Sequence, residues 1–525
     1  MSDRDIQLYF DARLAEIDAR DTDALQTYQT LFKSHGDSAA LADRLFDNAI
    51  RIGNMDAAVR AARAQELQGA ATGAVPMLLF ADALKRRQWN DAENAATLLE
   101  EKSNFGFAAP ILRSWTNIAR GKAHRFKIDD AREQALLNYY STDQRAYFEL
   151  AEGKLDRAKI MLEGFIGMDD DFARDLLIRA APIYAAKGDQ KFASFIIEKA
   201  VERRNSDSLT GPKQSQSDAN FSAEQGFAAL NTRLAASLVE QNVPDQGLIL
   251  ARVAVWLDPA SDAAKRTLAR ALQATGSPAL ARGTWAMIPE SSPYWTRAVG
   301  EQVRHYSDEG NYTTALKLAQ NAVERRPDSA SLILLAAQAQ ERLGDFKSAS
   351  KAYERLVDDA DQAGVPPTQM ALYLLFYATA LDKNGRWTEA KSFLDKARNL
   401  DPNNPYILNY LGYSLLERGE NLETALSYVK QAHMLEPDSA AIVDSLGWGY
   451  YLNGQYEQAV IHLEKAVQQS GNDLTINEHM GDAYWKAGRR VDARYAWKTA
   501  KHLAKDEDAA RLAEKINIGL PLTRR

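Results

Sequence analysis

The chain has 525 residues, no cysteine and a formal net charge of −7, from 64 basic and 71 acidic side chains. The small acidic excess argues against a general nucleic-acid-binding protein, which normally presents a basic face. The lack of cysteine excludes disulfides, thiolate metal ligands and cysteine nucleophiles. No apolar run in the sequence is long enough to cross a bilayer.

Residues 1–203 carry a weak repeated signal of helical hairpins. In several places a turn glycine is followed five residues later by an alanine that would start the next helix. These pairs are Gly53 and Ala58, Gly153 and Ala158, and Gly188 and Ala193. Trp89-Asn90-Asp91-Ala92 resembles Trp387-Thr388-Glu389-Ala390 far downstream, as the start of a hairpin's second helix. We predict a degenerate helical superhelix over residues 1–203.

Residues 204–221 interrupt this rhythm. The segment from Asn205 to Asn220 is polar, contains Gly211-Pro212 and has almost no apolar residue with which to bury a face. We interpret 204–221 as a polar loop or linker between an N-terminal superhelix at 1–203 and a C-terminal one at 222–525. The alternative interpretation is a binding loop or a protease-sensitive hinge.

The clearest repeats lie in residues 371–505, after weaker units that start near Tyr306 and Gly344. One pattern returns three times: Leu408-x-x-Leu411-Gly412-x-x-Leu415, Val443-x-x-Leu446-Gly447-x-x-Tyr450 and Asn477-x-x-Met480-Gly481-x-x-Tyr484. The glycines are 35 and 34 residues apart. Four alanines keep step with them at spacings of 35, 34 and 34: Ala390, Ala425, Ala459 and Ala493. A small residue on the first helix of each hairpin would let the second helix approach closely.

This pattern resembles the tetratricopeptide repeat, a helical hairpin of about 34 residues. The resemblance implies an all-α fold, a helix-turn-helix solenoid wound as a right-handed superhelix. We expect about fourteen helix pairs and a C-terminal capping helix at 506–520. Leu512 and Ile516 of that helix could cover the last repeat while its charges point outward. The resemblance implies binding of a protein or peptide.

In that family, the second, fifth, ninth, twelfth and thirteenth positions of each repeat face a concave groove. Applied to repeats that begin near Pro405, Ala440 and Leu474, this rule predicts a partner-binding groove. Its residues are Tyr406, Asn409, Tyr413, Asp444, Trp448, Tyr451, Glu478, Asp482 and Trp485, and the rule also gives Glu417 and Lys486. The aromatic residues would form a ladder with carboxylates between them, suited to a peptide with Lys or Arg or to a partner that presents backbone N–H groups. The alternative is that Trp448 and Trp485 pack against the neighbouring repeat.

A carboxylate clamp is disfavoured, because Asp444 and Glu478 stand where such a clamp needs cationic or amide groups. Phosphate-binding glycine motifs and zinc-protease motifs are absent from the sequence. His433, His462 and His479 are the only histidines that could converge, and we interpret them as partly exposed helix residues. We expect no enzymatic activity, no cofactor and no metal site.

A narrower resemblance covers about residues 290–520. Ser292-Pro293-Tyr294, Gly385-Arg386-Trp387 and the three glycine motifs resemble long proteobacterial tetratricopeptide-repeat proteins. Some of those are outer-membrane lipoproteins that act as adaptors for a periplasmic carboxyl-terminal processing protease. The resemblance implies a non-enzymatic scaffold of the bacterial cell envelope, in the periplasm or at the outer membrane, that recruits this protease and its substrates.

The start of the sequence leaves the compartment open. It shows neither a basic n-region nor an apolar core, so we expect no signal peptide in the sequence as printed. Membrane anchoring would then need a lipidated leader. The alternatives are a scaffold for polysaccharide or outer-membrane assembly machinery and a cytoplasmic chaperone-like protein.

Overall fold

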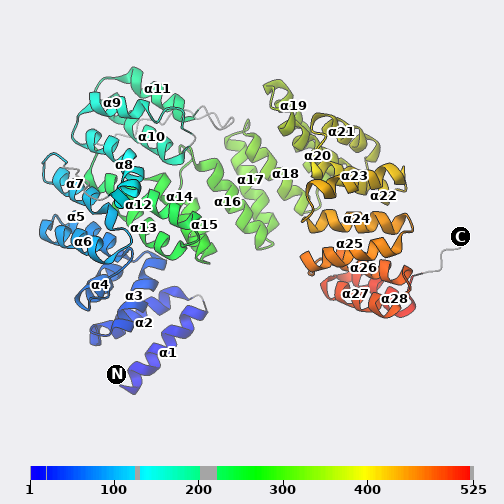
Figure 1. The fold of residues 1–525 in the computed structure, drawn as a ribbon, viewed down its shortest axis with the longest axis horizontal. Coiled ribbons are helices and arrows are strands. Elements are labelled where there is room, and N and C mark those ends of the chain that lie inside the picture. Colours follow the sequence, from blue (N-terminus) through cyan, green and yellow to red (C-terminus); the bar gives the residue numbers. More distant parts are fainter. Residues whose placement is uncertain (1, 19, 125–130, 169, 202–220, 521–525) are drawn as a thin grey trace. The chain divides into compact units, whose positions relative to one another are not determined.

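The computed structural model describes residues 2–18, 20–124, 131–168, 170–201 and 221–520 (Figure 1). Across these residues the chain forms 28 α-helices and one short 3-10 helix, without any strand. This confirms the predicted all-α helix-turn-helix fold. The chain divides into two compact units, Met1–Leu335 and Ala336–Arg525. No described helix combines the length and the apolar character that a bilayer-spanning helix requires.

Helix α18 (Ala330–Arg342) contains the division between the two units. The first unit holds α1 (Asp3–Ile17), α2 (Asp21–Ser34), α3 (Ala39–Ile52), α4 (Met55–Leu67), α5 (Val75–Lys85), α6 (Trp89–Lys102), the 3-10 helix η1 (Gly106–Ala108), α7 (Ala109–Ala119), α8 (Ala131–Ala151), α9 (Leu155–Glu163), α10 (Asp171–Ala186), α11 (Gln190–Val201), α12 (Ala223–Glu240), α13 (Pro244–Leu257), α14 (Asp262–Ala274), α15 (Pro278–Ala286), α16 (Trp295–Asp308) and α17 (Tyr312–Arg325).

The turn signals found in residues 1–203 fall where they were expected. Gly53 ends α3 with φ 92°, a left-handed conformation that glycine adopts without strain. Ala58 is fully buried in the next helix, α4, so the two helices approach closely. Trp89 begins α6, and its downstream counterpart Trp387 begins α21 (Trp387–Leu400). The spacing of glycine and alanine therefore predicted where these hairpins turn.

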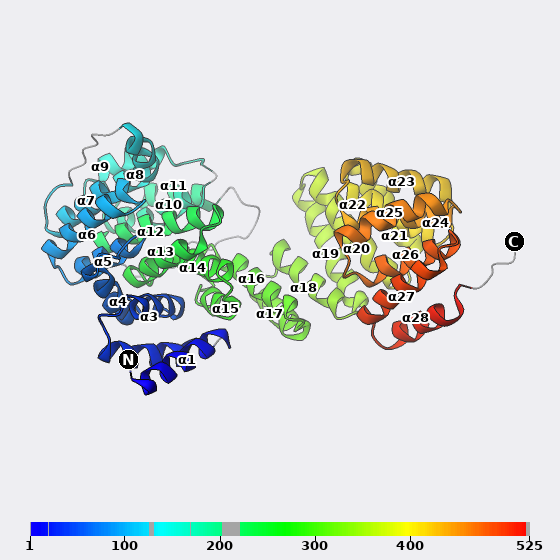
Figure 2. The ribbon, with the colours of Figure 1, turned by 60° about the horizontal axis from the view of Figure 1, so that its bottom comes forward.

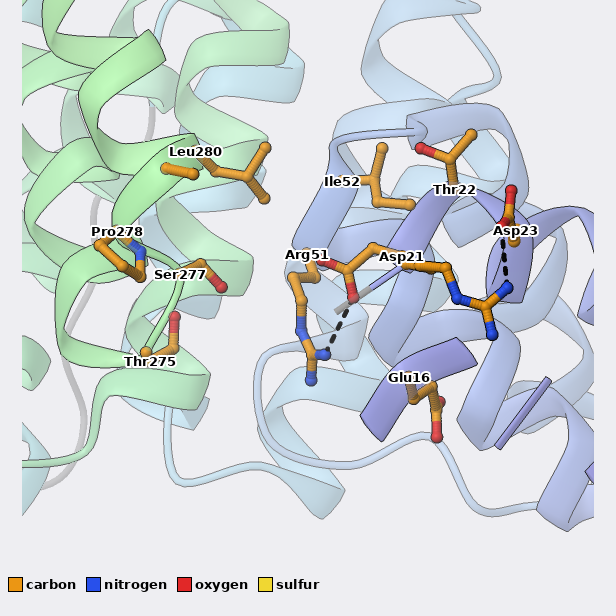
Figure 3. A pocket seen from close by; sticks show the side chains of 13 residues that line it. Glu16, Asp21, Thr22, Asp23, Arg51, Ile52, Thr275, Ser277, Pro278 and Leu280 are labelled. Atoms are coloured by element: carbon orange, nitrogen blue, oxygen red, sulfur yellow. Dashed lines mark hydrogen bonds and ion pairs between the residues drawn. The ribbon is translucent and has the colours of Figure 1, made fainter. Parts of the chain in front are cut away.

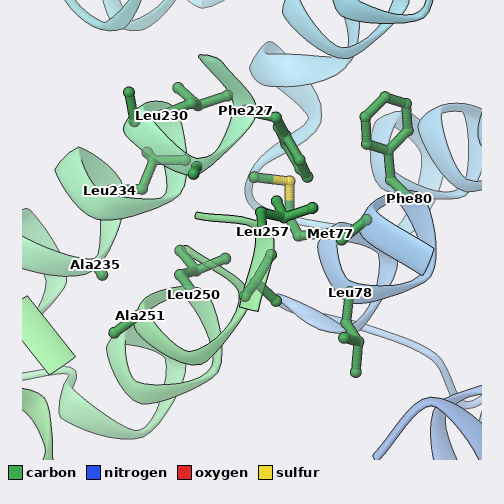
Figure 4. Close-up of a cluster of buried hydrophobic side chains, with 14 of the residues drawn as sticks. Met77, Leu78, Phe80, Phe227, Leu230, Leu234, Ala235, Leu250, Ala251 and Leu257 are labelled. Carbon is green, nitrogen blue, oxygen red and sulfur yellow. The ribbon is translucent and has the colours of Figure 1, made fainter. Parts of the chain in front are cut away.

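Helix α12 is the structural centre of the first unit. All of its residues from Gly226 to Ala236 are buried. It packs against α5, α7 and α8, which precede residue 204, and against α13 and α14, which follow residue 221. In Figure 4, Met77 and Phe80 of α5 lie among Phe227 and Leu230 of α12 and Leu250 of α13. One hydrophobic core is thus built from helices on both sides of the polar segment.

Buried ion pairs connect the same two parts of the chain. Arg233 of α12 donates to Asp143 of α8 at 2.6 Å, and both side chains are buried. Arg179 of α10 donates to Asp258, just after α13, also at 2.6 Å. The structure therefore places the division of the chain at Leu335, not at 204–221. Residues 204–220 of the expected linker lie outside the described residues.

The second unit contains the regular repeats. It holds α19 (Phe346–Ala363), α20 (Pro367–Lys383), α21 (Trp387–Leu400), α22 (Pro405–Glu417), α23 (Leu422–Leu435), α24 (Ala440–Leu452), α25 (Tyr456–Gln469), α26 (Leu474–Lys486), α27 (Arg490–Leu503) and α28 (Asp506–Ile518). We call α20, α22, α24 and α26 the A helices, and α21, α23, α25 and α27 the B helices. Each A helix packs against the B helix that follows it, and the hairpins stack in chain order (Figures 1 and 2).

Close packing inside each hairpin depends on the repeated glycines. A Cβ atom on Gly447 of α24 would lie 2.6 Å from Cγ of Leu463 on α25. A Cβ atom on Gly412 of α22 would lie 2.7 Å from Cγ2 of Val429 on α23. Only a hydrogen atom fits at these positions, because real Cβ atoms do not come so near another side chain. The predicted close approach of the paired helices is confirmed.

Candidate partner-binding face

The nine predicted groove residues all lie on three A helices of the second unit, and we call this surface the A-helix face. Tyr406 is exposed, whereas the three carboxylates are buried and the remaining five side chains are half-buried. From α22 come Tyr406, Asn409 and Tyr413; from α24 come Asp444, Trp448 and Tyr451; from α26 come Glu478, Asp482 and Trp485. The repeat register thus assigned these residues to the expected helices. Their binding role stays a prediction.

An aromatic stack stands at the middle of the A-helix face. The Trp448 ring stacks on Tyr451, with centroids 4.5 Å apart, and on His479 of α26, with centroids 4.0 Å apart. The Trp448 indole N–H donates to Glu417 of α22, and Nδ1 of His479 is hydrogen-bonded to Asp444 at 3.0 Å. Trp448 therefore contacts both neighbouring A helices, which fixes the orientation of its ring.

The carboxylates of this face follow a common pattern: each is paired with a donor that comes later in the chain. These pairs are Asp382 with Arg418, Glu417 with Trp448, Asp444 with His479, Glu478 with Arg511, and both Glu478 and Asp482 with Lys515. We expected these carboxylates to attract Lys or Arg from a peptide. In the structure they bind donors of the chain itself, as the buried carboxylates Asp444, Glu478 and Asp482 require, whereas Glu417 is exposed.

The tyrosines of the face lie in an environment that disfavours a phenolate. Burial, followed by the charges of Glu417 and Asp444, raises the pKa of Tyr413 well above its ordinary value. Burial and the charge of Asp482 raise the pKa of Tyr451 in the same way. Both side chains are therefore neutral at physiological pH. They contribute ring surface and a hydroxyl group, and no charge.

The C-terminal end of the A-helix face is covered by α28. Lys515 of α28 contacts Glu478 at 2.6 Å and Asp482 at 2.7 Å, and Arg511 also pairs with Glu478. We expected the charges of the capping helix to point outward, and for Arg511 and Lys515 this is wrong. The reason is the two buried carboxylates of α26, which need cations. The spacing of residues along the sequence did not predict these contacts of Arg511 and Lys515.

Trp485 also lies at the covered end. Its ring packs against Trp497 of α27, with centroids 5.5 Å apart, and Gly519 lies directly against the ring. Trp485 thus contacts the B helix of its own hairpin and Gly519 at the end of α28. The six predicted residues on α22 and α24 carry no such cover from α28 in the contacts described above.

The three histidines do not converge on one point. His433 and His462 meet on the B helices α23 and α25, with ring centroids 5.8 Å apart, while His479 belongs to the aromatic stack. Burial, together with the charge of Lys465, lowers the pKa of both His433 and His462. Cationic neighbours oppose binding of a metal ion. Across the described part of the chain, no group of three or more His, Asp or Glu side chains could hold a metal.

The first unit has a separate polar cavity of about 830 Å³ (Figure 3). It lies between the start of α2, the end of α3 and the turn from α14 to α15. Arg51 pairs with Asp21 at 3.3 Å, and Arg20 pairs with Asp23 at 3.3 Å. Because these charges neutralise one another in pairs, the cavity offers no single strong anchor for a ligand.

Comparison with known proteins adds a family match at the centre of the chain. Residues 306–365 match the family model described as tetratricopeptide repeat. This segment is thus similar to that family. It begins at Tyr306, where the first of the weaker repeat units was recognised, and the regular hairpins of the second unit continue after it. No curated protein matches the sequence.

Several solved structures resemble the chain at low identity. The APC/C hetero-tetramer Cut9-Hcn1 is 15% identical, with 98% of this chain and 97% of that chain covered and a TM-score of 0.40. Yeast Tom70 is 12% identical, with 98% and 95% covered and a TM-score of 0.39. The tetratricopeptide-repeat protein TTC0263 of Thermus thermophilus is 23% identical, with 36% and 99% covered and a TM-score of 0.31.

Proposed function

We propose that this chain is a protein-interaction scaffold whose second unit binds a partner on the A-helix face. The observation that supports the proposal best is the aromatic stack of Tyr451, Trp448 and His479. Trp448 and His479 are held by hydrogen bonds to Glu417 and Asp444, so these two rings are oriented before a partner arrives. Preorganised aromatic side chains lose little entropy on binding and dominate the energetics of interfaces.

The chemistry of the face favours a partner that brings apolar or aromatic side chains. Tyr406 is 55% exposed at the start of α22, and Tyr413 and Trp448 offer half-buried rings. The acidic side chains at the middle of the face already accept hydrogen bonds from Trp448 and His479. A partner would gain more from contact with the rings than from the carboxylates, because Asp444 is buried against His479 and breaking a buried pair costs about 3–5 kcal/mol.

The finer role that we propose is that of an adaptor for a periplasmic carboxyl-terminal processing protease in the bacterial cell envelope. Its support is the resemblance of about residues 290–520 to long proteobacterial tetratricopeptide-repeat proteins. An adaptor of this kind works by raising the effective concentration of protease and substrate, and it needs no catalytic residue. The expectation that the chain is not an enzyme stays a prediction.

The test of the face is a comparison of two aromatic substitutions. Trp448→Ala removes the central ring of the stack, and Tyr495→Ala removes a tyrosine that is 66% exposed on the B helix α27. The tagged wild type and both variants are crosslinked in cells and purified, and the partners are quantified by mass spectrometry. We expect Trp448→Ala to reduce recovery of the specific partner at least tenfold, and Tyr495→Ala to leave it unchanged.

Equal recovery by all three proteins would contradict binding at the A-helix face. The identity of the recovered partner tests the finer role at the same time. A carboxyl-terminal processing protease would support the adaptor. Assembly proteins for polysaccharide or the outer membrane, or cytoplasmic chaperones, would instead support one of the two alternative functions.

A further inference from the structure

Helix α28 differs from every A helix of the second unit in how it is held. Among its described side chains, Leu512 alone is buried. Helices α22 and α24 each bury seven residues, and α26 buries eight. Polar contacts supply much of the attachment of α28, through Arg511 and Lys515 and through a hydrogen bond from Arg494 to the carbonyl of Ile516 at 2.9 Å. Few buried apolar contacts make an element prone to local opening.

The surface under α28 contains three of the nine predicted groove residues. Glu478 and Asp482 pair with the cations of α28, and Trp485 lies against Gly519. The position that α28 occupies is therefore part of the A-helix face itself. A helix that belongs to the chain sits where a partner would sit.

We propose that α28 is an internal ligand, which a basic helix of a partner protein displaces from the A-helix face. This inference rests on the proposed function, because it adds one repeat to the surface that a partner can reach. Departure of α28 would uncover Trp485 and leave the carboxylates of Glu478 and Asp482 without their cations. Tethering gives α28 a high effective concentration, so a free partner has to compete with it.

The buried carboxylates define the chemistry of the incoming helix. The Glu478 side chain is 10% exposed and the Asp482 side chain is 8% exposed. A buried carboxylate that loses its cation is strongly unfavourable, so a replacement has to supply positive charge. Arg511 and Lys515 are four residues apart and lie one turn apart on α28, with Leu512 beside them. The partner is thus a helix with two cations one turn apart and an adjacent apolar residue.

The test uses the full chain and a synthetic peptide that copies residues 505–520 with a fluorescent label. In the double variant Arg511→Glu with Lys515→Glu, the chain's own helix presents carboxylates to Glu478 and Asp482 and is repelled. We expect amide exchange in 506–518 to accelerate at least tenfold. We also expect the variant to bind the labelled peptide at least tenfold more tightly than wild type, as measured by fluorescence anisotropy.

A matched control keeps α28 docked while altering the same number of charged side chains. Glu507→Gln with Glu514→Gln alters two exposed side chains of α28, and this variant should behave as wild type. A peptide in which both cations are replaced by glutamate should bind neither protein. If circular dichroism shows that the double variant is unfolded, Lys515→Ala alone provides the milder test with the same expected direction.

Two outcomes would overturn the proposal. One is a folded variant whose 506–518 amides stay as protected as in wild type, so that α28 does not leave. The other is a variant that releases α28 and still binds the peptide no better than wild type. Both are distinct from failure of the A-helix face, because the peptide assay does not depend on Trp448 and the pull-down does not depend on Arg511.

Discussion

At the residue scale, the glycines of the A helices decide how closely each hairpin can pack. Gly412 and Gly447 each face a branched side chain of the following B helix, Val429 and Leu463. Both apolar partners are fully buried. These positions therefore accept hydrogen alone, which is why the glycine recurs once per repeat.

Substitution of one such glycine should be costly. In Gly447→Ala the new Cβ would lie 2.6 Å from Cγ of Leu463 and 3.2 Å from its backbone nitrogen. Relief of this overlap requires a shift of α25, so we expect a loss of about 1–3 kcal/mol in unfolding free energy. Urea unfolding followed by circular dichroism measures it.

The control for that prediction is Gly283→Ala in α15, where no atom lies within 4 Å of the added Cβ. Alanine is a better helix former, so this change should be neutral or stabilise the protein by about 0.5–1 kcal/mol. Similar unfolding midpoints for both variants would show that the packing at Gly447 tolerates a methyl group.

At the element scale, α13 is joined to the C-terminal end of α3, which is distant from it in the sequence. Arg252 of α13 donates from Nε to the carbonyl of Ile50 at 2.8 Å and also binds the carbonyl of Arg51, at the C-terminus of α3. The last carbonyl groups of a helix have no hydrogen-bond donor inside the helix. The Arg252 guanidinium therefore supplies a donor to the carbonyl groups of Ile50 and Arg51. Burial lowers the pKa of Arg252 to about 10.

Removal of this guanidinium should loosen the end of α3. We expect Arg252→Ala to destabilise the first unit by about 1–3 kcal/mol, because the carbonyl groups of Ile50 and Arg51 lose their donor. Faster amide exchange in residues 49–54, measured by mass spectrometry, would locate the effect. Arg270→Ala, which removes an arginine that contacts Glu240 at 3.5 Å, serves as the control. An unchanged exchange rate in 49–54 would contradict the role of Arg252.

At the scale of the whole molecule, the helices before and after residues 204–221 belong to one folding unit. Phe80 of α5 meets Phe227 of α12 with ring centroids 4.8 Å apart, and Arg233 of α12 reaches Asp143 of α8. Helix α12 buries an unbroken run from Gly226 to Ala236 because α5, α7 and α8 pack against it together with α13 and α14. Neither part can complete its hydrophobic core alone.

Cleavage of the chain between these parts should therefore leave them together. With a specific protease site inserted in 204–220, we expect the two fragments to co-elute in gel filtration after the cut and to separate only in denaturant. Phe227→Glu, which places a charge in the shared core, should allow the cut fragments to part. Separation of the unsubstituted fragments under native conditions would mean that the shared core is not needed.

Much of the local structure could be predicted from the sequence. Gly53, Ala58 and Trp89 marked turns and helix starts, and Leu512 marked the buried side of the cap. Local rules work here because each hairpin contacts mainly its neighbours in the chain. The position of the division was not predictable, since the polar composition of 204–221 describes that segment and not the helices on either side of it.

The sequence by itself determined the all-α repeat fold and the helices that carry Tyr406, Tyr413, Trp448 and Tyr451, because side-chain size at a fixed spacing dictates how hairpins pack. Only the tertiary structure decided that Asp444 binds His479 and that Glu478 and Asp482 bind the cations of α28. Those pairs join different helices, and charge along a chain does not reveal which side chain a buried carboxylate will meet.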